Sequence, residues 1–301
     1  MASSASDQDW TSIAPLLNFK SDTQTPIELA QDVQLRPWTL ADQARDDPHN
    51  LMRFMLGQLG PFAGSLNFGW AVSTPIRRQP PNFAIDSSEA LAKFDRVLDG
   101  LRLLHDELVA YPFVLTGMGT PVRISMGSSG FPVPAPQVWG MALNHPYVLN
   151  YRDIGELRST CDLIDRELSA RSDGPLSLAL ARLSSAHYRW TDADRIIDSA
   201  IALETVLLPG SGGEFSYRQA IRGAWLLGGT SDDRGRNFDL FREAYDRRSK
   251  IVHGDKDPGK PAASEIMSLT RLVVRSFLAS ASECSHRELI HRLDLQAVSG
   301  L

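Results

Sequence analysis

The sequence predicts an α+β protein, in which a mixed α/β domain is followed by an all-α helical bundle. Three observations predict this class. Short apolar runs separated by turn residues fill the first half of the 301-residue chain, as in a sheet domain. From Asp153 onward, apolar residues recur every three or four positions, as in amphipathic helices. Glycine, proline and serine separate those helical segments. We therefore expect a tail over 1–20, an N-terminal α/β domain over 21–172 and a helical domain over 173–301.

The first half contains the strand-like segments. A run over 27–35 follows Thr25-Pro26, and the segment 66–76 alternates apolar and polar residues as a half-buried strand does. Ser87-Ser88-Glu89 is typical of a helix start, and apolar residues at helical spacing continue to about Val109. Two short strands are expected over 113–115 and 122–126, followed by a turn at Gly127-Ser128-Ser129-Gly130.

The second half reads as one helix after another. The boundaries come from capping residues such as Thr191 and from breakers such as Pro209-Gly210 and Gly228-Gly229. Short connections between successive helices predict antiparallel packing in a bundle. The expected helices cover 153–170, 176–190, 192–208, 215–227, 237–252, 264–280 and 288–295.

Composition and charge restrict the function classes. With 31 Lys plus Arg against 36 Asp plus Glu, the chain does not coat nucleic acid by charge alone. The two halves differ, with 14 basic and 20 acidic residues through Gly174 and 17 basic and 16 acidic residues from Pro175 onward. Two cysteines, Cys161 and Cys284, have no zinc-ligand spacing, so we expect reduced thiols, no metal site and no cofactor. We find no signal peptide and no membrane-spanning run, and expect a cytoplasmic protein with no membrane partner.

Two charged residues fall where the helical pattern expects apolar ones. The helix over 237–252 has the apparent stripe Phe238, Phe241, Tyr245, Arg248 and Val252. In the helix over 192–208, Glu204 interrupts the stripe in the same way. Since buried charges are costly unless they are paired, we expect Glu204 and Arg248 to pair inside the bundle. Tyr245, in the same stripe, can stack on a nucleobase, but its place in the stripe favours packing in the core.

His253 follows Arg248 by five residues, just before the helix terminator Gly254. On an ideal helix this spacing separates the two side chains by about 140°, so they do not point the same way. A histidine can donate and accept a proton near neutral pH, and arginine supplies a permanent forked cation for a phosphate oxygen. Both abilities suit phosphodiester cleavage. An isolated Arg-x-x-x-x-His pair is common by chance, so the pair indicates a function only together with the surrounding sequence.

That context is an ordered set of segments that resembles the ApeA-like HEPN domains, which belong to the HEPN endoribonuclease superfamily. The resemblance extends over about 176–281. It is carried by Leu203-Glu204, by Ser216-Tyr217-Arg218, and by the run Arg248-Ser249-Lys250-Ile251-Val252-His253-Gly254. Ser249 departs mildly from the family, which often has Asn after the arginine. The N-terminal half resembles only loosely the variable region that precedes such domains.

The resemblance implies a homodimeric helical bundle that cleaves RNA without a metal ion. Arg248 and His253 fall on the catalytic pair, and Glu204 and Ser249 on supporting positions. The reaction implied is attack of the ribose 2′-hydroxyl on its own phosphate, in an effector of bacterial defence, abortive infection or toxin type. The expected partner is transfer RNA or messenger RNA, with a phage-derived trigger or an antitoxin as a further partner. Arg247, next to the motif, and Lys250, within it, either guide RNA phosphates or form a solvated helix face.

Two other interpretations remain open at the level of sequence. The helical domain can be a HEPN unit that no longer cuts and serves RNA binding or dimerisation. It can also be the HEPN member of a toxin–antitoxin pair. The presence of both Arg248 and His253 favours the catalytic interpretation.

Overall fold

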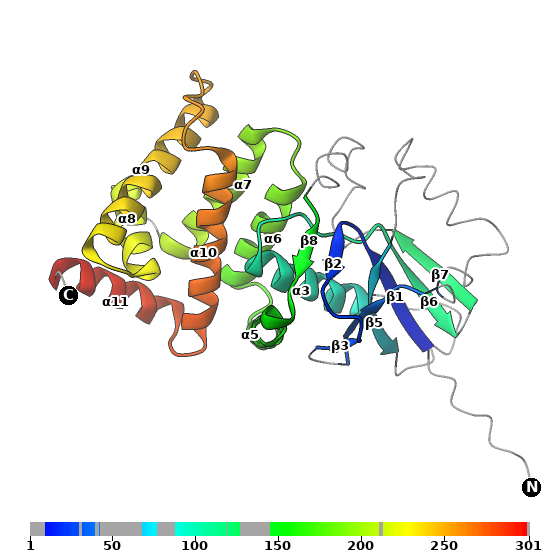
Figure 1. Cartoon of the computed structure of the whole chain (residues 1–301). Helices are drawn as coiled ribbons and strands as arrows, with labels where there is room; N and C mark the ends of the chain where they lie inside the picture. The colour runs from blue at the N-terminus through cyan, green and yellow to red at the C-terminus, as the bar shows by residue number, and fades with distance from the viewer. Residues whose placement is uncertain are drawn as a thin grey trace, which may run out of the picture. The chain divides into compact units, whose positions relative to one another are not determined.

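The computed structural model describes residues 10–29, 32–39, 42, 68–76, 88–118, 120–126, 145–210 and 213–299. It is a mixed α+β structure, with a sheet in the N-terminal part and helices in the rest (Figure 1). The chain forms two compact units, residues 1–161 and 162–301. The boundary lies inside helix α5 (Ile154–Ala170) rather than after residue 172, where the sequence predicts it. The predicted turn at 127–130 lies outside the described residues.

The first unit contains a six-stranded sheet in the order β3-β4-β5-β1-β6-β7. Neighbouring strands are antiparallel throughout this sheet. The sheet is not a simple meander, because β1 lies between β5 and β6, which come much later in the sequence. The six strands are β1 (Trp10–Leu16), β3 (Ile27–Glu28), β4 (Gln34–Pro37), β5 (Trp70–Ile76), β6 (Phe113–Met118) and β7 (Thr120–Met126).

Strand β1 corrects the predicted tail over 1–20. Residues 10–16 form a central strand with neighbours on both sides, and its side chains from Ser12 to Leu16 are buried. The segment mixes small, polar and apolar residues, so it lacks the alternation by which half-buried strands are recognised. Strand β1 is instead covered on both faces of the sheet, so its residues do not alternate between apolar and polar. The predicted strand over 27–35 is also wrong in detail, because it is the short hairpin β3–β4.

Helix α3 (Ser88–Leu104) packs on the sheet and completes the main core of the first unit. Its buried face, which includes Phe94 and Leu101, meets Leu16 and Val72 of the sheet and Leu157 of α5 in one cluster. A smaller parallel pair, β2 (Phe19–Ser21) and β8 (Tyr147–Leu149), joins the same cluster. The opposite face of the sheet has its own apolar cluster, formed by Ile13, Trp38, Ala71, Phe113 and Leu115.

The second unit is the helical bundle. Helices α6 and α7 pack as a hairpin, as do α8 and α9; α10 packs against α6, α7 and α8, and α11 packs against α8. Their bounds are α6 (Pro175–Tyr188), α7 (Asp192–Leu207), α8 (Phe215–Leu227), α9 (Ser231–His253), α10 (Ala263–Ala281) and α11 (His286–Ser299). The helices described in the structure include none that is long and apolar enough to cross a membrane.

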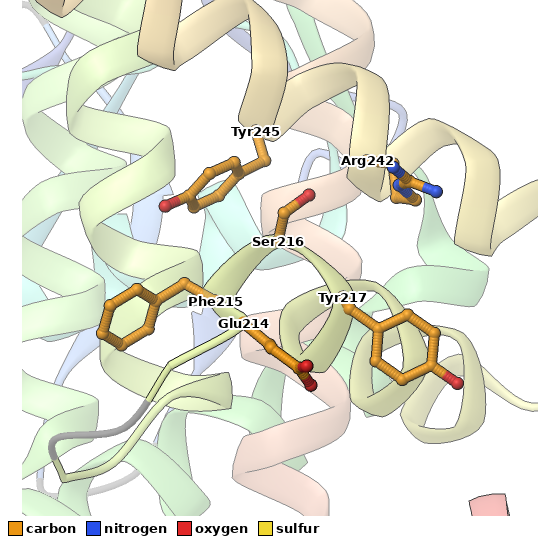
Figure 2. Close-up of a pocket in the computed structure, with 6 residues that line it drawn as sticks. All are labelled: Glu214, Phe215, Ser216, Tyr217, Arg242 and Tyr245. Atoms are coloured by element: carbon orange, nitrogen blue, oxygen red, sulfur yellow. The ribbon is translucent and has the colours of Figure 1, made fainter.

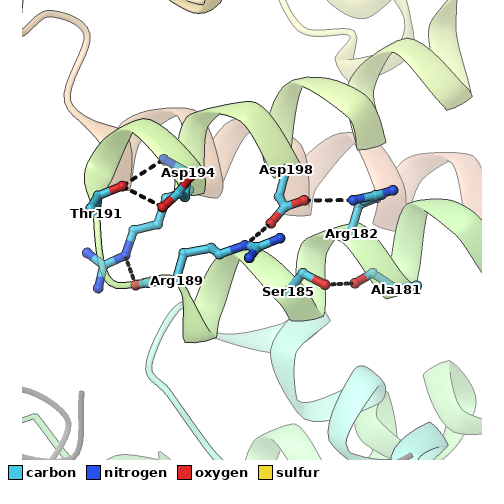
Figure 3. Close-up of polar contacts among 8 residues, drawn as sticks. Ala181, Arg182, Ser185, Arg189, Thr191, Asp194 and Asp198 are labelled. Atoms are coloured by element: carbon cyan, nitrogen blue, oxygen red, sulfur yellow. Dashed lines mark hydrogen bonds and ion pairs between the residues drawn. The ribbon is translucent and has the colours of Figure 1, made fainter. Parts of the chain in front are cut away.

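The α6–α7 hairpin is fixed by a buried carboxylate (Figure 3). Asp198, 2% exposed, accepts hydrogen bonds from Arg182 at 3.0 Å and from Arg189 at 2.6 Å. The hydrogen bond to Asp198 raises the pKa of Arg189. Thr191 caps α7 by accepting a hydrogen bond from the backbone N–H of Asp194, as its sequence position predicts. These contacts hold α7, which carries Glu204, against α6.

Candidate functional site

Helix α9 carries most of the predicted site, and its two ends are well determined by local sequence. It begins at Ser231, six residues before the predicted start, because Thr230 and Asp233 form a reciprocal capping box. It remains helical through His253 and ends at Gly254, which adopts a left-handed conformation with φ of 75°. The predicted terminator is therefore confirmed, and His253 is the last residue of the helix.

The buried face of α9 differs from the stripe expected from the sequence. It consists of Phe241, Ala244 and Arg247, with Ile251 partly buried, whereas Val252 is 50% exposed. Ala244 and Ile251 contact Ile196 of α7 and Ala263 and Ile266 of α10 in one apolar cluster. The C-terminal half of α9 thus packs against α7 and meets the first turn of α10.

Arg248 and Glu204 lie together, as predicted. Nη2 of Arg248 lies 3.4 Å from Oε1 of Glu204, which joins α9 to α7. Both side chains are half-buried rather than fully buried, at 26% and 30% exposure. Nε of Arg248 is shielded from solvent and has no hydrogen-bond partner among the described residues. The guanidinium is therefore held at one end by Glu204 while part of its hydrogen-bonding capacity is unused.

His253 is exposed, and a single protomer does not bring it to Arg248. Because α9 stays regular to its last residue, the two side chains leave the helix about 140° apart. Ser249 is half-buried and Lys250 is exposed. Ser249 and His253 are four residues apart and share the outer face of α9. The site of one protomer is therefore two separate features, a Glu204–Arg248 pair and an exposed histidine.

Arg247 does not have the RNA-guiding position expected for it. Its side chain is 4% exposed, and it donates hydrogen bonds to both carboxylate oxygens of Asp257 at 2.7 and 2.8 Å. It also donates to the backbone carbonyl of Pro261. The hydrogen bonds from Arg247 and from the N–H of Gly259 lower the pKa of Asp257 to about 2. Arg247 fixes the segment that follows α9, and we withdraw it from the RNA-contacting set.

Arg222 is a second buried arginine, and the sequence analysis assigned it no role. It lies 3% exposed on α8, donates to both carboxylate oxygens of Asp294 on α11, and donates to the carbonyl of Leu207 at 2.8 Å. The last bond holds the final turn of α7, next to Glu204. The available signal was a cation at core spacing in α8.

The described part of the chain contains no group of three or more His, Cys, Asp or Glu side chains placed to hold a metal ion. Comparison of the sequence with protein-family models and with curated proteins gives no match, and comparison of the fold with solved structures gives none.

Proposed function

We propose that this protein is an endoribonuclease of HEPN type, acting as a defence or toxin effector on transfer RNA or messenger RNA. The observation that carries the proposal is the pairing of Glu204 with Arg248 across two helices, on the same helix α9 that ends at an exposed His253. These are the residues that the resemblance to HEPN domains assigns to the site. The Arg248 side chain is 26% exposed, and the exposed part of its forked guanidinium is suited to receive a phosphate oxygen.

The proposed reaction is a transesterification within the RNA. The ribose 2′-oxygen attacks the adjacent phosphorus while a base takes its proton, and the bond from phosphorus to the 5′-oxygen breaks. The 5′-oxygen receives a proton, so the products are a 2′,3′-cyclic phosphate and a 5′-hydroxyl. In this scheme His253 transfers the proton and Arg248 stabilises the charge that develops on the phosphorane. The nucleophile belongs to the substrate, which is why the reaction requires RNA and needs no metal-activated water.

The separation of Arg248 and His253 within one helix favours a site made by two subunits. A two-fold dimer that packs the ends of two α9 helices together would place Arg248 of one subunit near His253 of the other. Val252, exposed between them, offers an apolar contact for such an interface. The same separation also favours a second candidate, a non-cutting RNA-binding module, if no such dimer forms.

The test is incubation of the purified protein with total RNA in EDTA, beside His253→Ala. His291→Ala is the matched control, because His291 is also exposed but lies on α11, at the end of the bundle away from the α9–α10 connection (Figure 1). We expect cleavage by the parent and by His291→Ala, with cyclic-phosphate ends. His253→Ala should lose at least about a hundredfold in rate, the usual contribution of a general acid–base residue.

Equal cleavage by His253→Ala and the parent would refute the assignment of His253. Absence of cleavage by the parent, together with absence of toxicity when it is expressed in growing cells, would favour the binding module. Toxicity that a neighbouring protein suppresses would identify an antitoxin partner.

A further inference from the structure

An open pocket of about 600 Å³ lies between the start of α8 and the middle of α9, apart from the Glu204–Arg248 pair. Figure 2 shows its six lining residues, which come from the first turn of α8 and from one face of α9. They are Glu214, Phe215, Ser216, Tyr217, Arg242 and Tyr245.

Aromatic side chains dominate the pocket and remain accessible. Phe215 is 42% exposed and Tyr217 is 53% exposed, although large apolar rings are normally covered. The ring of Tyr217 is held edge-on against Phe238, with centroids 5.7 Å apart. In Figure 2, Phe215 and Tyr245 lie on one side of the pocket and Tyr217 on the other. Accessible aromatic faces of this kind are the platforms on which unpaired nucleobases stack.

The pocket also has groups that suit a phosphate. Arg242 is exposed, and the structure shows no ion pair between it and any described carboxylate. The first turn of α8 has no side-chain cap, so its backbone N–H groups remain available at the helix end. Oγ of Ser216 is shielded from solvent and lacks a hydrogen-bond partner within the described ranges. Arg242 and the backbone N–H groups at the start of α8 are therefore the donors that a phosphate in the pocket can reach.

Glu214 gives the pocket a means of selecting a base. Its carboxylate is exposed at the rim and can only accept hydrogen bonds when ionised. Cytosine, adenine and guanine each carry an exocyclic amino group that can donate to a carboxylate at the edge of the base, whereas uracil can donate only through its ring N3–H. The same negative charge repels phosphate, which places a phosphate at Arg242 and the base toward Phe215.

The pocket lies in line with the proposed catalytic histidine. Arg242, Tyr245, Ser249 and His253 follow one another at steps of three and four residues, so they share one face of α9. Tyr245 and His253 are about 12 Å apart along the helix axis, at 1.5 Å per residue. A single strand that enters the pocket can therefore continue along α9 to His253.

We propose that this pocket binds one nucleotide of single-stranded RNA beside the cleavage position, and that it prefers a base with an exocyclic amino group. The base stacks on Phe215 and Tyr245, its amino group donates to Glu214, and a phosphate contacts Arg242. This inference rests on the proposed function, because it assigns the position of that RNA substrate. Tyr245, which the sequence placed in the core, is in this view a half-buried residue that also presents its ring to the pocket.

The test measures binding of fluorescent 2′-O-methyl oligocytidylate and oligouridylate, which cannot be cleaved because the 2′-oxygen is blocked. We expect the parent to bind oligocytidylate more tightly, and Phe215→Ala to weaken that binding about tenfold, as loss of one stacked base does. Arg242→Gln should weaken binding to both oligonucleotides alike and reduce its salt dependence. Glu214→Gln should reduce the preference for oligocytidylate.

Matched controls are Trp190→Ala, an exposed aromatic residue beyond the end of α6, and Arg287→Gln, an exposed arginine on α11. Both should bind as the parent does. Unchanged affinity in Phe215→Ala and Arg242→Gln would overturn the pocket assignment, as would equal binding of the two oligonucleotides by the parent. The cleavage assay, run on the same preparations, separates the two proposals. If the parent cleaves RNA but the pocket variants bind as the parent does, only the pocket proposal is refuted. If the pocket variants lose binding but the parent does not cleave, only the nuclease proposal is refuted.

Discussion

Arg247 and Arg248 are neighbours in the chain with different surroundings. One helical step turns the side chain by about 100°, which places Arg247 inside the fold and Arg248 at its margin. Arg247 is satisfied by the two oxygens of Asp257 and the carbonyl of Pro261. Arg248 has one longer contact, to Glu204. The first arginine therefore holds the end of α9 in place, and the second keeps the capacity to bind an anion.

The Arg247–Asp257 pair predicts a pH-dependent contribution to stability. The pKa of Asp257 is lowered from 3.8 to about 2 in the folded chain. A lowered folded pKa means that the stabilisation is present above the unfolded pKa and is lost as the pH falls through the folded one. The difference in unfolding free energy between the parent and Asp257→Asn should therefore shrink as the pH is lowered from about 5 to about 2.

Urea unfolding followed by circular dichroism at several pH values measures this difference, and high salt should reduce it because Asp257 is partly exposed. Asp255→Asn is the control, since Asp255 is an exposed carboxylate in the same segment with no ion pair among the described residues. A difference that stays constant with pH would contradict the assigned role.

The sequence predicted the pairing of Glu204 with Arg248 correctly, but it did not predict that Arg247 is buried. A charge in an apolar stripe predicts a charged partner; the predicted Glu204–Arg248 pair forms, but both side chains are half-buried at the margin of the fold rather than inside it. The stripe itself was counted through Tyr245 and Val252, whereas the buried face passes through Ala244 and Arg247. An arginine that is neutralised inside the fold is indistinguishable by pattern from one that faces solvent. Arg247 is buried because it pairs with Asp257, and Asp257 lies in a loop whose sequence has no periodicity from which the pairing could be predicted.

At the scale of helices, the contact between α8 and α9 depends on one glycine. A Cβ atom added at Gly223 would lie 2.3 Å from the ring of Phe241, which is fully buried. The absence of a side chain at Gly223 therefore lets α9 approach α8 closely. The same two helices also form the pocket, near the start of α8.

Gly223→Ala should accordingly destabilise the protein by about 2 kcal/mol, because the ring of Phe241 must move within a packed core. The matched control is Gly235→Ala, which lies within α9 and has no atom within 4 Å of the added Cβ. That change should stabilise the helix by about 0.5 to 1 kcal/mol. Thermal unfolding of both variants distinguishes them, and a Gly223→Ala variant as stable as the parent would show that the contact is loose.

Helix positions were predictable from caps and breakers, whereas strand β1 was not. Thr191, Gly228 and Gly254 end or begin helices where the sequence indicates. Even the early start of α9 has a local signal, the capping box of Thr230 and Asp233, which the apolar stripe alone does not include. Strand β1 has no such signal, because its position depends on pairing with β5 and β6 far along the chain.

At the scale of the whole molecule, the two units have separate cores, and the proposed catalytic residues all belong to the second. Within that unit, α9 keeps Arg248 and His253 on different sides of one regular helix. This separation favours a site that combines Arg248 of one subunit with His253 of the other, so the proposed mechanism has a testable consequence, a functional dimer.

The prediction is complementation between two inactive proteins. His253→Ala keeps Arg248, and Arg248→Gln keeps His253, so a mixed dimer contains one complete site and one that lacks both residues. Random exchange of subunits in an equal mixture gives about half mixed dimers, and thus about a quarter of the parental activity for a two-fold interface. The two variants should be co-expressed, purified together through one tag that both carry, so that all dimer species are kept, and assayed on RNA in EDTA. If each subunit formed its site alone, the mixture would stay as inactive as its components. Recovery near a quarter would show that Arg248 of one chain acts with His253 of the other.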